Sequence, residues 1–480
     1  MRVVLVNPPL TTEERYGVHF RSGGMTPPLG LACLAAMLLR QNIDVRIVDG
    51  ALFNNYNNIV DDILRTSPDI VGLTASTMSI HNAAAVADAV KRKKSTVTTI
   101  IGGPHITAVP KETMLKFRSF DIGVVGEADI TIAELLKSLD TGQGLRLING
   151  IIYRTDGGTV QTPNRDYIEN LDDLPMPAWG LLPNLAKFYC PPVHTVKNIP
   201  AALLVTSRGC PGKCKFCDRS LFGNNIRAHS ATYVMSMMRD LYDKYGIREF
   251  QFRDDNFLAF RPRLVELCRL LKESDLKVTW SVAGRIDMAN PEVLKMMHDA
   301  GCWQIWYGVE SGSQRVLDFI NKHTKLDKIR ETIKMTKDAG IDVGGFFMIG
   351  LPTETPADIE ATIRFSRELE LDEAHFTFFT PLPGCELYDD INQYGRFNND
   401  WKKASMWNPV FIPEGMTERQ LVRYWKLSSM GFYMRPRIII GYIKKIRSWG
   451  HIKVYLQGVM SLLEAVFIKK YKGDDRAGKS

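Results

Sequence analysis

The amino-acid sequence predicts an α/β protein, in which a doubly wound parallel sheet precedes a partial (β/α)6 barrel and a helical C-terminal region. Short runs rich in Val and Ile alternate with helix-period stretches in two separate parts of the chain, and Gly, Pro and polar residues follow these runs. A length of 480 residues provides for roughly two to four domains. With 45% hydrophobic and 24% charged residues, the composition is globular and excludes disordered, collagen-like and disulfide-scaffold classes.

Residues 1–140 are expected to form the first sheet. Its predicted strands are residues 3–6, 45–48, 70–74, 98–101 and 122–125, and its clearest helices are residues 29–39 and 80–90. Strands that alternate with helices in this way form a parallel sheet. Ligands of such sheets bind beyond the carboxyl ends of the strands, where the loops here are rich in Gly, Pro, Ser and Thr.

Residues 141–199 are interpreted as a hairpin followed by a connector. The hairpin pairs residues 151–153 with residues 159–160 across a turn that contains Asp156, Gly157 and Gly158. The connector is marked by prolines at positions 175, 177, 183, 191 and 192. The prolines therefore indicate a connector between the two larger domains.

Residues 200–400 repeat the strand–helix alternation about six times. The predicted strands are residues 202–206, 249–253, 278–282, 304–309, 343–349 and 375–379, with helices such as 230–245 and 327–339 between them. Six units with long helices favour a parallel barrel that is open on one side. Its functional loops are expected at the C-terminal face, after each strand.

Residues 401–480 are expected to form basic amphipathic helices. From Gly415 to Ser480 there are 14 Lys and Arg against four Asp and Glu, which leaves residues 1–414 slightly acidic. Between 417 and 472 basic residues such as Arg435, Arg437 and Arg447 interleave with apolar and aromatic residues such as Trp449. One interpretation is helices that pack on the barrel with a solvated basic face. The alternative is peripheral contact with an anionic membrane surface. Nucleic-acid binding is disfavoured, because no nucleic-acid module is present.

The chain shows no secretory or membrane-spanning signal. Four apolar residues before Asn7 and Pro8 are too few for the core of a signal peptide, and no 18 consecutive apolar residues occur. We therefore expect a cytoplasmic protein, with association at the cytoplasmic face of a membrane as the alternative.

The strongest chemical signal is a group of three cysteines directly after the first barrel strand. Cys210, Cys214 and Cys217 lie in one loop, which Gly209, Pro211 and Gly212 keep compact. A closed zinc site needs four ligands, and no fourth Cys or His lies nearby, so we expect a [4Fe–4S] cluster with one open iron. A partial zinc site is the alternative.

The C-x3-C-x2-C spacing with Phe216 before the last cysteine resembles the radical S-adenosylmethionine (SAM) superfamily. In that superfamily the open iron binds the amino and carboxylate groups of SAM, and reductive cleavage gives a 5′-deoxyadenosyl radical. The resemblance extends to segments 252–257, 308–313, 347–354 and 380–384, in this order.

The resemblance implies SAM-binding roles for polar residues that follow the barrel strands. It places the Asp254 and Asp255 loop at the methionine amino group. It places Glu310 and Ser311 along the SAM site, and Phe216 and Gly350 near adenine. Arg285 also lies just past a strand, where a ligand on that face would meet it. The plain alternative for each carboxylate is that it caps the following helix.

The first domain lacks the G-x-G-x-x-G pattern of dinucleotide sites. Instead, Thr74, Ser76, Thr77, Gly102, Gly103, His105, Gly126 and Glu127 follow its strands. Paired glycines allow a bulky ligand to approach the backbone. This set resembles the cobalamin-binding domain found upstream of radical SAM barrels, and the resemblance implies that these residues contact cobalamin.

One departure concerns the cobalt ligand. Cobalamin domains of methionine synthase and the mutases carry D-x-H-x-x-G after the first strand, whereas here the loop is Asn7-Pro-Pro-Leu-Thr-Thr. The resemblance therefore implies cobalt without that His ligand. His105 either replaces it or, more plainly, hydrogen-bonds the loop or ligand. An empty, vestigial domain is a further alternative.

The remaining cysteines carry weaker signals. Cys33 and Cys268 lie in helical apolar patterns, which indicates core positions, and Cys302 beside the fourth barrel strand indicates packing. Cys385 follows the sixth strand on the catalytic face, where a substrate-side role is conceivable. Cys190 in the connector indicates nothing specific.

The chain is thus identified as a member of the cobalamin-binding radical SAM enzymes, most similar to the class B radical SAM methyltransferases. This implies methylation of an unactivated carbon of an amphipathic small molecule, such as a lipid or tetrapyrrole, with an external electron donor such as ferredoxin or flavodoxin. The sequence also resembles the anaerobic magnesium-protoporphyrin monomethyl ester cyclases, which implies oxidative cyclisation instead. A non-catalytic cobalamin-binding sensor is the third hypothesis.

Overall fold

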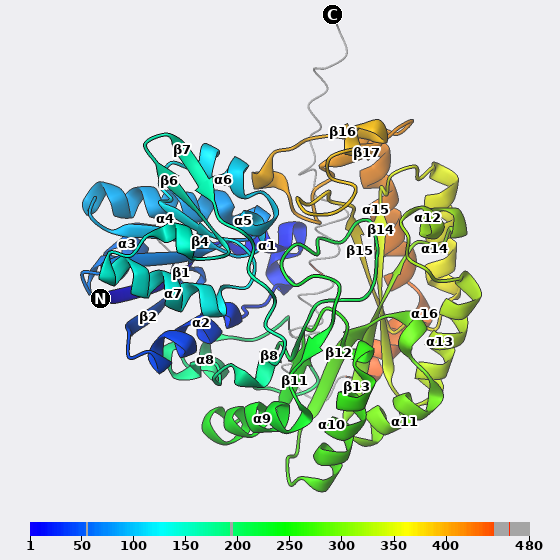
Figure 1. Ribbon diagram of the computed structural model, residues 1–480. Helices are drawn as coiled ribbons and strands as arrows, with labels where there is room; N and C mark the ends of the chain where they lie inside the picture. Colours follow the sequence, from blue (N-terminus) through cyan, green and yellow to red (C-terminus); the bar gives the residue numbers. More distant parts are fainter. Residues whose placement is uncertain (54–55, 193–194, 446–459, 461–480) are drawn as a thin grey trace, which may run out of the picture.

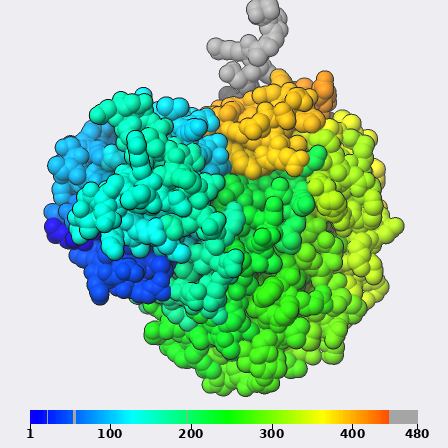
Figure 2. All heavy atoms as spheres, viewed as in Figure 1, coloured from blue at the N-terminus to red at the C-terminus, as the bar shows by residue number. Residues whose placement is uncertain are grey.

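The computed structural model describes residues 1–53, 56–192, 195–445 and 460 (Figure 1). Two lobes lie side by side, one built on the N-terminal sheet and the other on the barrel strands. Figure 2 shows them in contact on the face in view, and the orange segment around β16 and β17 lies over both.

In the described residues, the N-terminal sheet has seven strands in the order β2-β1-β3-β4-β5-β6-β7. Their bounds are β1 Arg2–Asn7, β2 Asp44–Asp49, β3 Ile70–Thr74, β4 Thr98–Gly102, β5 Ile122–Val124, β6 Ile151–Thr155 and β7 Gly158–Gln161. The first five are parallel, and the β6–β7 hairpin continues the sheet antiparallel to β5. The predicted doubly wound sheet and its hairpin are confirmed.

Helices cover both faces of this sheet. Their bounds are α1 Thr12–Tyr16, α2 Leu29–Arg40, α3 Tyr56–Leu64, α4 Ile80–Lys93, α5 Pro104–Ala108, α6 Pro110–Lys116, α7 Ala128–Thr141 and, in the connector, α8 Leu185–Phe188. Helices α2 and α7 share one apolar cluster with the sheet, while α3 and α4 share the other. Because the strands are continuous apolar runs, the sheet has a core on each side.

The second lobe is an open parallel half-barrel. Within the described part of the chain, six parallel strands follow the order β15-β14-β13-β12-β11-β8, and β15 and β8 remain unpaired edges. Their bounds are β8 Ala201–Leu204, β11 Glu249–Phe252, β12 Thr279–Gly284, β13 Cys302–Glu310, β14 Asp342–Ile349 and β15 Glu373–Phe378. The prediction of a partial, open barrel is confirmed.

The barrel helices lie outside the strands (Figure 1). Their bounds are α9 Ala231–Tyr245, α10 Arg261–Glu273, α11 Pro291–Asp299, α12 Gln314–Phe319, α13 Leu326–Asp338 and α14 Pro356–Glu368. Alternate residues of each strand, such as Phe250, Phe252, Ile305 and Tyr307, pack against these helices. The intervening residues therefore point to the concave inner face.

The cysteine loop leaves the barrel through a short antiparallel ladder. Strand β9, Ser207–Arg208, pairs with β10, Arg227–Ala228, so that the loop between them is closed at its base. Arg208 lies directly opposite Arg227 in this ladder. The base of the loop thus presents two neighbouring guanidinium groups.

The C-terminal region packs on the barrel, and its Trp401 packs on the N-terminal lobe against His105. It contains β16 Gly395–Phe397, β17 Phe411–Pro413, α15 Glu418–Tyr433 and α16 Pro436–Lys445. Trp425 Nε1 of α15 donates to Phe376 O at 2.7 Å, and Tyr433 Oη donates to Ala374 O at 2.8 Å. Helix α15 therefore packs on the barrel, as the first interpretation of this region predicts. Arg447 and Trp449 lie outside the described residues. Among the helices that the structure describes, none has the length and apolar character needed to cross a membrane.

Candidate functional site

The three cysteines lie together in the loop between β9 and β10. Cys214 is buried, while Cys210 and Cys217 are partly exposed. The Cys217 amide donates to Cys214 O at 3.2 Å. A Cβ atom at Gly212 would lie 3.4 Å from Cys210 Sγ and 2.9 Å from Arg285 Nη1, so glycine leaves room beside the thiols.

The electrostatic environment of the loop favours a thiolate at Cys214, whereas burial raises the pKa of Cys210. Arg285 Nη1 lies 3.4 Å from Cys214 Sγ, and the Lys322 ammonium is also close. The hydrogen bond from Cys217 and these two cations lower the pKa of Cys214, while the same hydrogen bond raises the pKa of Cys217. Within the described residues, no three His, Cys, Asp or Glu side chains surround a single-ion site. Three thiols beside two cations fit an anionic iron–sulfur cluster, in which each cysteine binds a different iron.

Lys322 forms a buried ion pair with Glu310 next to this loop. Their Nζ and Oε1 atoms are 2.6 Å apart, and Nζ lies 5.7 Å from the centroid of the Phe216 ring. Glu310 has a φ of 67°, so the end of β13 bends at this residue. The pair places one positive and one negative charge beside the cysteines.

Asp254 and Asp255 have different environments. Asp254 is buried and accepts from Thr206 N at 2.6 Å, from the hydroxyls of Thr206 and Ser207 at 2.8 Å each, and from Arg263 at 3.2 Å. Asp255 is exposed and accepts from Gly209 N at 3.1 Å. The carboxylate of Asp254 is thus saturated by protein donors, while that of Asp255 is accessible beside the cysteine loop.

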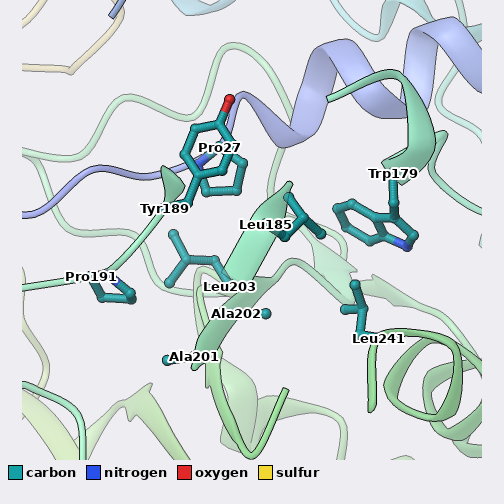
Figure 3. A pocket seen from close by; sticks show the side chains of 9 residues that line it. All are labelled: Pro27, Trp179, Leu185, Tyr189, Pro191, Ala201, Ala202, Leu203 and Leu241. Carbon is teal, nitrogen blue, oxygen red and sulfur yellow. The ribbon is translucent and has the colours of Figure 1, made fainter. Parts of the chain in front are cut away.

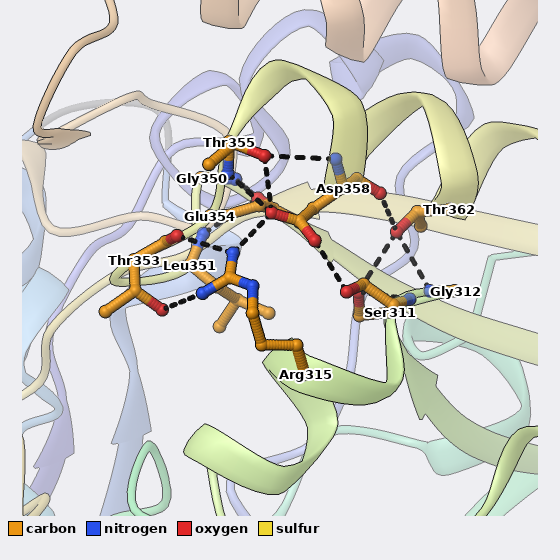
Figure 4. Close-up of polar contacts among 11 residues, drawn as sticks. Ser311, Gly312, Arg315, Gly350, Leu351, Thr353, Glu354, Thr355, Asp358 and Thr362 are labelled. Atoms are coloured by element: carbon orange, nitrogen blue, oxygen red, sulfur yellow. Dashed lines mark hydrogen bonds and ion pairs between the residues drawn. The ribbon is translucent and has the colours of Figure 1, made fainter.

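Ser311 and Gly350 belong to a network at the ends of β13 and β14 (Figure 4). Ser311 Oγ lies 3.1 Å from Thr362 Oγ1 of α14. The amides of Gly350 and Leu351 donate to Glu354 Oε2 at 2.6 and 3.1 Å. Glu354 Oε1 is buried without a hydrogen-bond partner, and burial raises the pKa of Glu354 to about 8. In Figure 4, Arg315 points toward Thr353 and Asp358 and completes the network.

On the N-terminal lobe, the glycines after β4 and β5 border open space. A Cβ at Gly102 would meet its nearest neighbour, Leu73 O, at 4.0 Å, and one at Gly126 would meet nothing within 4 Å. A Cβ at Gly103 would instead approach Thr74 Oγ1 at 2.8 Å, and its φ of 100° favours glycine. Gly102 and Gly126 therefore fit a cradle for a bulky cofactor.

His105 lies beneath the C-terminal region. Its ring is fully buried, with Nδ1 3.1 Å from Thr77 Oγ1 and its centroid 4.4 Å from that of Trp401. Burial lowers the pKa of His105 to about 3, and Nε2 has no hydrogen-bond partner. The hydrogen bond to Thr77 matches the plainer prediction for this residue. Ser76 is exposed at the same strand end.

Glu127, which follows Gly126, faces the barrel rather than open space. Its carboxylate accepts from Arg227 Nη1 at 2.9 Å and from Ile168 N at 2.9 Å, and Arg208 Nη1 lies 3.2 Å away. A role of Glu127 toward cobalamin stays a prediction, as do the cofactor contacts of the other residues named above. In the structure, Glu127 joins the two lobes by its contacts at the base of the cysteine loop.

The other cysteines are mostly packing residues. Cys268 and Cys302 are buried in the barrel core. Cys33 is partly exposed rather than in the core, because it lies at the junction near Asp129 and Arg208. Cys385 is buried, and burial raises the pKa of its thiol to about 11.

An apolar cavity lies beside β8, between the connector and the barrel (Figure 3). It is lined by Pro27, Trp179, Leu185, Tyr189, Pro191, Ala201, Ala202, Leu203 and Leu241. Its volume of about 10 Å³ is that of a single water molecule, so it cannot hold a substrate.

Comparison with known proteins matches both lobes. Residues 204–366 match the Radical SAM superfamily and residues 17–136 match the B12 binding domain. An uncharacterized methyltransferase of Pyrococcus horikoshii is 35% identical, over 95% of this chain and 99% of its own length. The chain belongs to the cobalamin-binding radical SAM enzymes.

Other similar proteins fit this family. The anaerobic magnesium-protoporphyrin IX monomethyl ester cyclase of Rubrivivax gelatinosus is 27% identical, over 100% of this chain and 85% of its own length. The cobalamin-dependent radical SAM enzyme OxsB with aqua-cobalamin bound has a TM-score of 0.74 at 18% identity, covering 97% of this chain and 72% of OxsB, which supports the fold. The [4Fe–4S] cluster, SAM and cobalamin are the cofactors of this enzyme family.

Sequence reasoning missed three site residues that the fold brings in. Lys322 follows α12 and reaches Glu310, Asp129 begins α7 and reaches Arg208, and Trp401 covers His105. The charges of Lys322 and Asp129 were visible in the sequence, but their partners lie 12 and 79 residues away. No local spacing signals such pairs.

Proposed function

We propose that the enzyme methylates an unactivated carbon atom of an amphipathic small molecule, using SAM, a [4Fe–4S] cluster and cobalamin. The observation that carries this proposal is the direct junction of the two cofactor lobes. The base of the cysteine loop is held by Glu127 and Asp129, which directly follow β5 and its open glycine, Gly126. A substrate radical and a methyl donor have to meet in one enclosed site, and this junction supports that requirement.

The residues have separate tasks in this proposal. Cys210, Cys214 and Cys217 would hold the cluster, and Gly102 with Gly126 would admit cobalamin. When bound, the cluster supplies the electron that cleaves SAM, and cobalamin supplies the methyl carrier.

The polar residues around the loop would orient SAM. The accessible carboxylate of Asp255 and the Glu310–Lys322 pair supply charges that complement its aminocarboxylate. Asp254 would act indirectly, since its oxygens hold the backbone of the β8 loop in place.

The test is anaerobic reconstitution with iron, sulfide and hydroxocobalamin, followed by trideuteromethyl SAM, reductant and a small-molecule extract as methyl acceptor. We expect cobalamin to co-elute with the protein, and deoxyadenosine and S-adenosylhomocysteine to form together with a trideuteromethylated product. Deoxyadenosine without S-adenosylhomocysteine, with cobalamin bound, contradicts methyl transfer and favours the cyclase.

Oxidative cyclisation is the second candidate, because a cyclase is 27% identical across the whole chain. It differs from methyl transfer in that no label from SAM enters the product. The shared cofactor lobes therefore cannot separate the two reactions, whereas the label can.

Partners belong to the same proposal. An external one-electron donor such as ferredoxin or flavodoxin would reduce the cluster. Helix α16 exposes Ile439, Ile440 and Ile443 beside the exposed Arg437, which supports peripheral contact with an anionic membrane or a lipid-like substrate. Flotation of the holoenzyme with vesicles of phosphatidylglycerol, compared with phosphatidylcholine, tests that contact.

A further inference from the structure

The inner face of the half-barrel carries a cation, Arg253, that has no counter-ion among the described residues. Arg253 directly follows β11, and its amide extends the ladder to Leu204 O at 2.7 Å. Because Phe250 and Phe252 pack outward against the helices, Gln251 and Arg253 point to the concave face. Arg253 remains solvent-exposed there, as does Val205 on the neighbouring strand end.

Arg253 differs from the other cations around the site. Arg285 pairs with Asp287, Arg263 with Asp254, and Lys322 with Glu310. Among the residues that the structure describes, no carboxylate lies within ion-pair distance of Arg253, whose side chain donates from Nη2 to Gln251 Oε1 at 2.8 Å. The surrounding protein lowers the pKa of Arg253 by desolvation, and Tyr16 of α1 is the neighbour that opposes this.

An aromatic wall lies across the same concave face. On neighbouring strands, Gln251 pairs with Ser281 and Ser281 pairs with Gln304, so these residues lie on the same inner face. Trp306, two residues after Gln304, points to that face as well. The Trp306 ring stacks on Phe346 at 4.9 Å and lies 4.5 Å from His375. Gly344 makes room for the indole, because a Cβ there would collide with it.

Phe346 and His375 are the residues of the wall that a ligand can reach, whereas Trp306 behind them is buried. Phe346 and His375 are partly exposed, whereas their chain neighbours Phe347 and Phe376 are buried against the helices. Below these aromatic residues, Gln251 is buried and donates a hydrogen bond to Thr195, so the base of the concave face is polar. A guanidinium and an apolar wall thus face the same space.

We propose that Arg253 binds an anionic group, a carboxylate or phosphate, of an aromatic or otherwise apolar substrate that lies along Trp306, Phe346 and His375. A guanidinium binds such groups through charge-assisted hydrogen bonds. This inference rests on the proposed function and narrows its substrate class to amphipathic anions.

The test uses the reconstituted holoenzyme and two fluorescent dyes. Anilinonaphthalene sulfonate is an aromatic anion, and phenylnaphthylamine has the same ring system without the sulfonate. We expect Arg253→Gln to weaken binding of the sulfonate by about tenfold or more, with Arg253→Lys intermediate, and to leave phenylnaphthylamine unchanged. Phe346→Ala is expected to weaken both dyes.

The control is Arg269→Gln, because Arg269 is an exposed arginine of α10 that pairs with Glu266 and Glu273. It should bind both dyes like the wild type. Equal sulfonate affinity in Arg253→Gln and wild type overturns the proposal, as does an equal loss of both dyes, which indicates a collapsed site. If Arg253→Gln loses affinity for SAM by the same factor as it loses affinity for the sulfonate, the guanidinium binds SAM. That result also overturns the proposal.

The dye measurements do not require turnover. Failure of the wild-type enzyme to form S-adenosylhomocysteine contradicts the proposed methyl transfer while leaving the dye result intact. The two proposals can therefore fail separately.

Discussion

Arg208 and Asp129 form a two-point ion pair across the two lobes, with Nη1–Oδ2 and Nη2–Oδ1 distances of 2.8 and 3.1 Å. Arg208 ends β9, two residues before Cys210, and Asp129 lies in the first turn of α7. Both side chains are nearly inaccessible to water, with exposures of 12% and 6%. The position of the cysteine loop is therefore tied directly to the cobalamin-binding lobe.

The first prediction concerns this ion pair. Asp129→Asn leaves the buried Arg208 with the more distant Glu127, and loss of one partner of a buried pair costs about 3 to 5 kcal/mol. We expect a lower melting temperature and, at temperatures where the variant is folded, more deoxyadenosine per methylated product. Glu134→Gln, which removes a surface pair with Arg165, is the control. An unchanged product ratio would show that the pair is structural only.

The second prediction concerns the cysteine loop. Cys210→Ala, Cys214→Ala and Cys217→Ala should each abolish SAM cleavage and the iron–sulfur absorbance while cobalamin stays bound, because the two cofactors are held by different lobes. Cys268→Ala, in the barrel core, should keep the cluster. SAM cleavage by Cys214→Ala at the wild-type rate contradicts this prediction. If the wild type cleaves SAM and Cys214→Ala does not, the sensor hypothesis is ruled out.

The third prediction separates Asp254 from Asp255. Asp254→Asn leaves Arg263 buried without its charge partner, so we expect a loss of about 3 to 5 kcal/mol in unfolding free energy. Asp255→Asn should leave the melting temperature almost unchanged and weaken SAM binding, because its carboxylate is accessible beside Gly209. Titration calorimetry and thermal unfolding of both variants measure this. The reverse pattern assigns SAM to Asp254.

The fourth prediction concerns the cobalamin cradle. Gly102→Val should fold normally, because its Cβ would meet no atom closer than 4.0 Å. The added side chain should exclude cobalamin, so its absorbance is expected to separate from the protein during gel filtration. Gly144→Val, whose Cβ also meets open space, is the control. Full retention of cobalamin by Gly102→Val places the cofactor elsewhere.

The fifth prediction concerns pH and Glu354. Burial raises its pKa to about 8, so between pH 5 and 8 the folded state holds one proton more than the unfolded state. Stability from this group is complete below the ordinary glutamate pKa and is lost as pH rises through about 8, with a slope of at most about 1.4 kcal/mol per pH unit. Glu354→Gln should flatten the decline of melting temperature over this range, relative to the exposed control Glu331→Gln. Parallel curves for Glu354→Gln and wild type refute the assignment.

The sequence by itself determined the elements and the chemistry. The strand at residues 70–74 was predicted with its observed bounds, because β-branched apolar runs between turn residues have few alternatives. The cysteine triad was equally readable, since its three cysteines lie within one loop and their spacing carries the signal. The open six-unit barrel followed from the number of strand–helix repeats.

Tertiary structure decided which charges meet. Asp254 and Asp255 look alike in sequence, yet one is saturated by Thr206 and Arg263 while the other is accessible. Arg253, adjacent to them, has no carboxylate partner in the described part of the chain, because alternation along β11 turns it to the concave face. The contacts of Glu127 with Arg208 and Arg227 were not visible in the sequence, and its role toward cobalamin stays a prediction. The burial and ion pairing of a side chain depend on residues that are distant in sequence. Short-range sequence patterns do not show which of these residues meet.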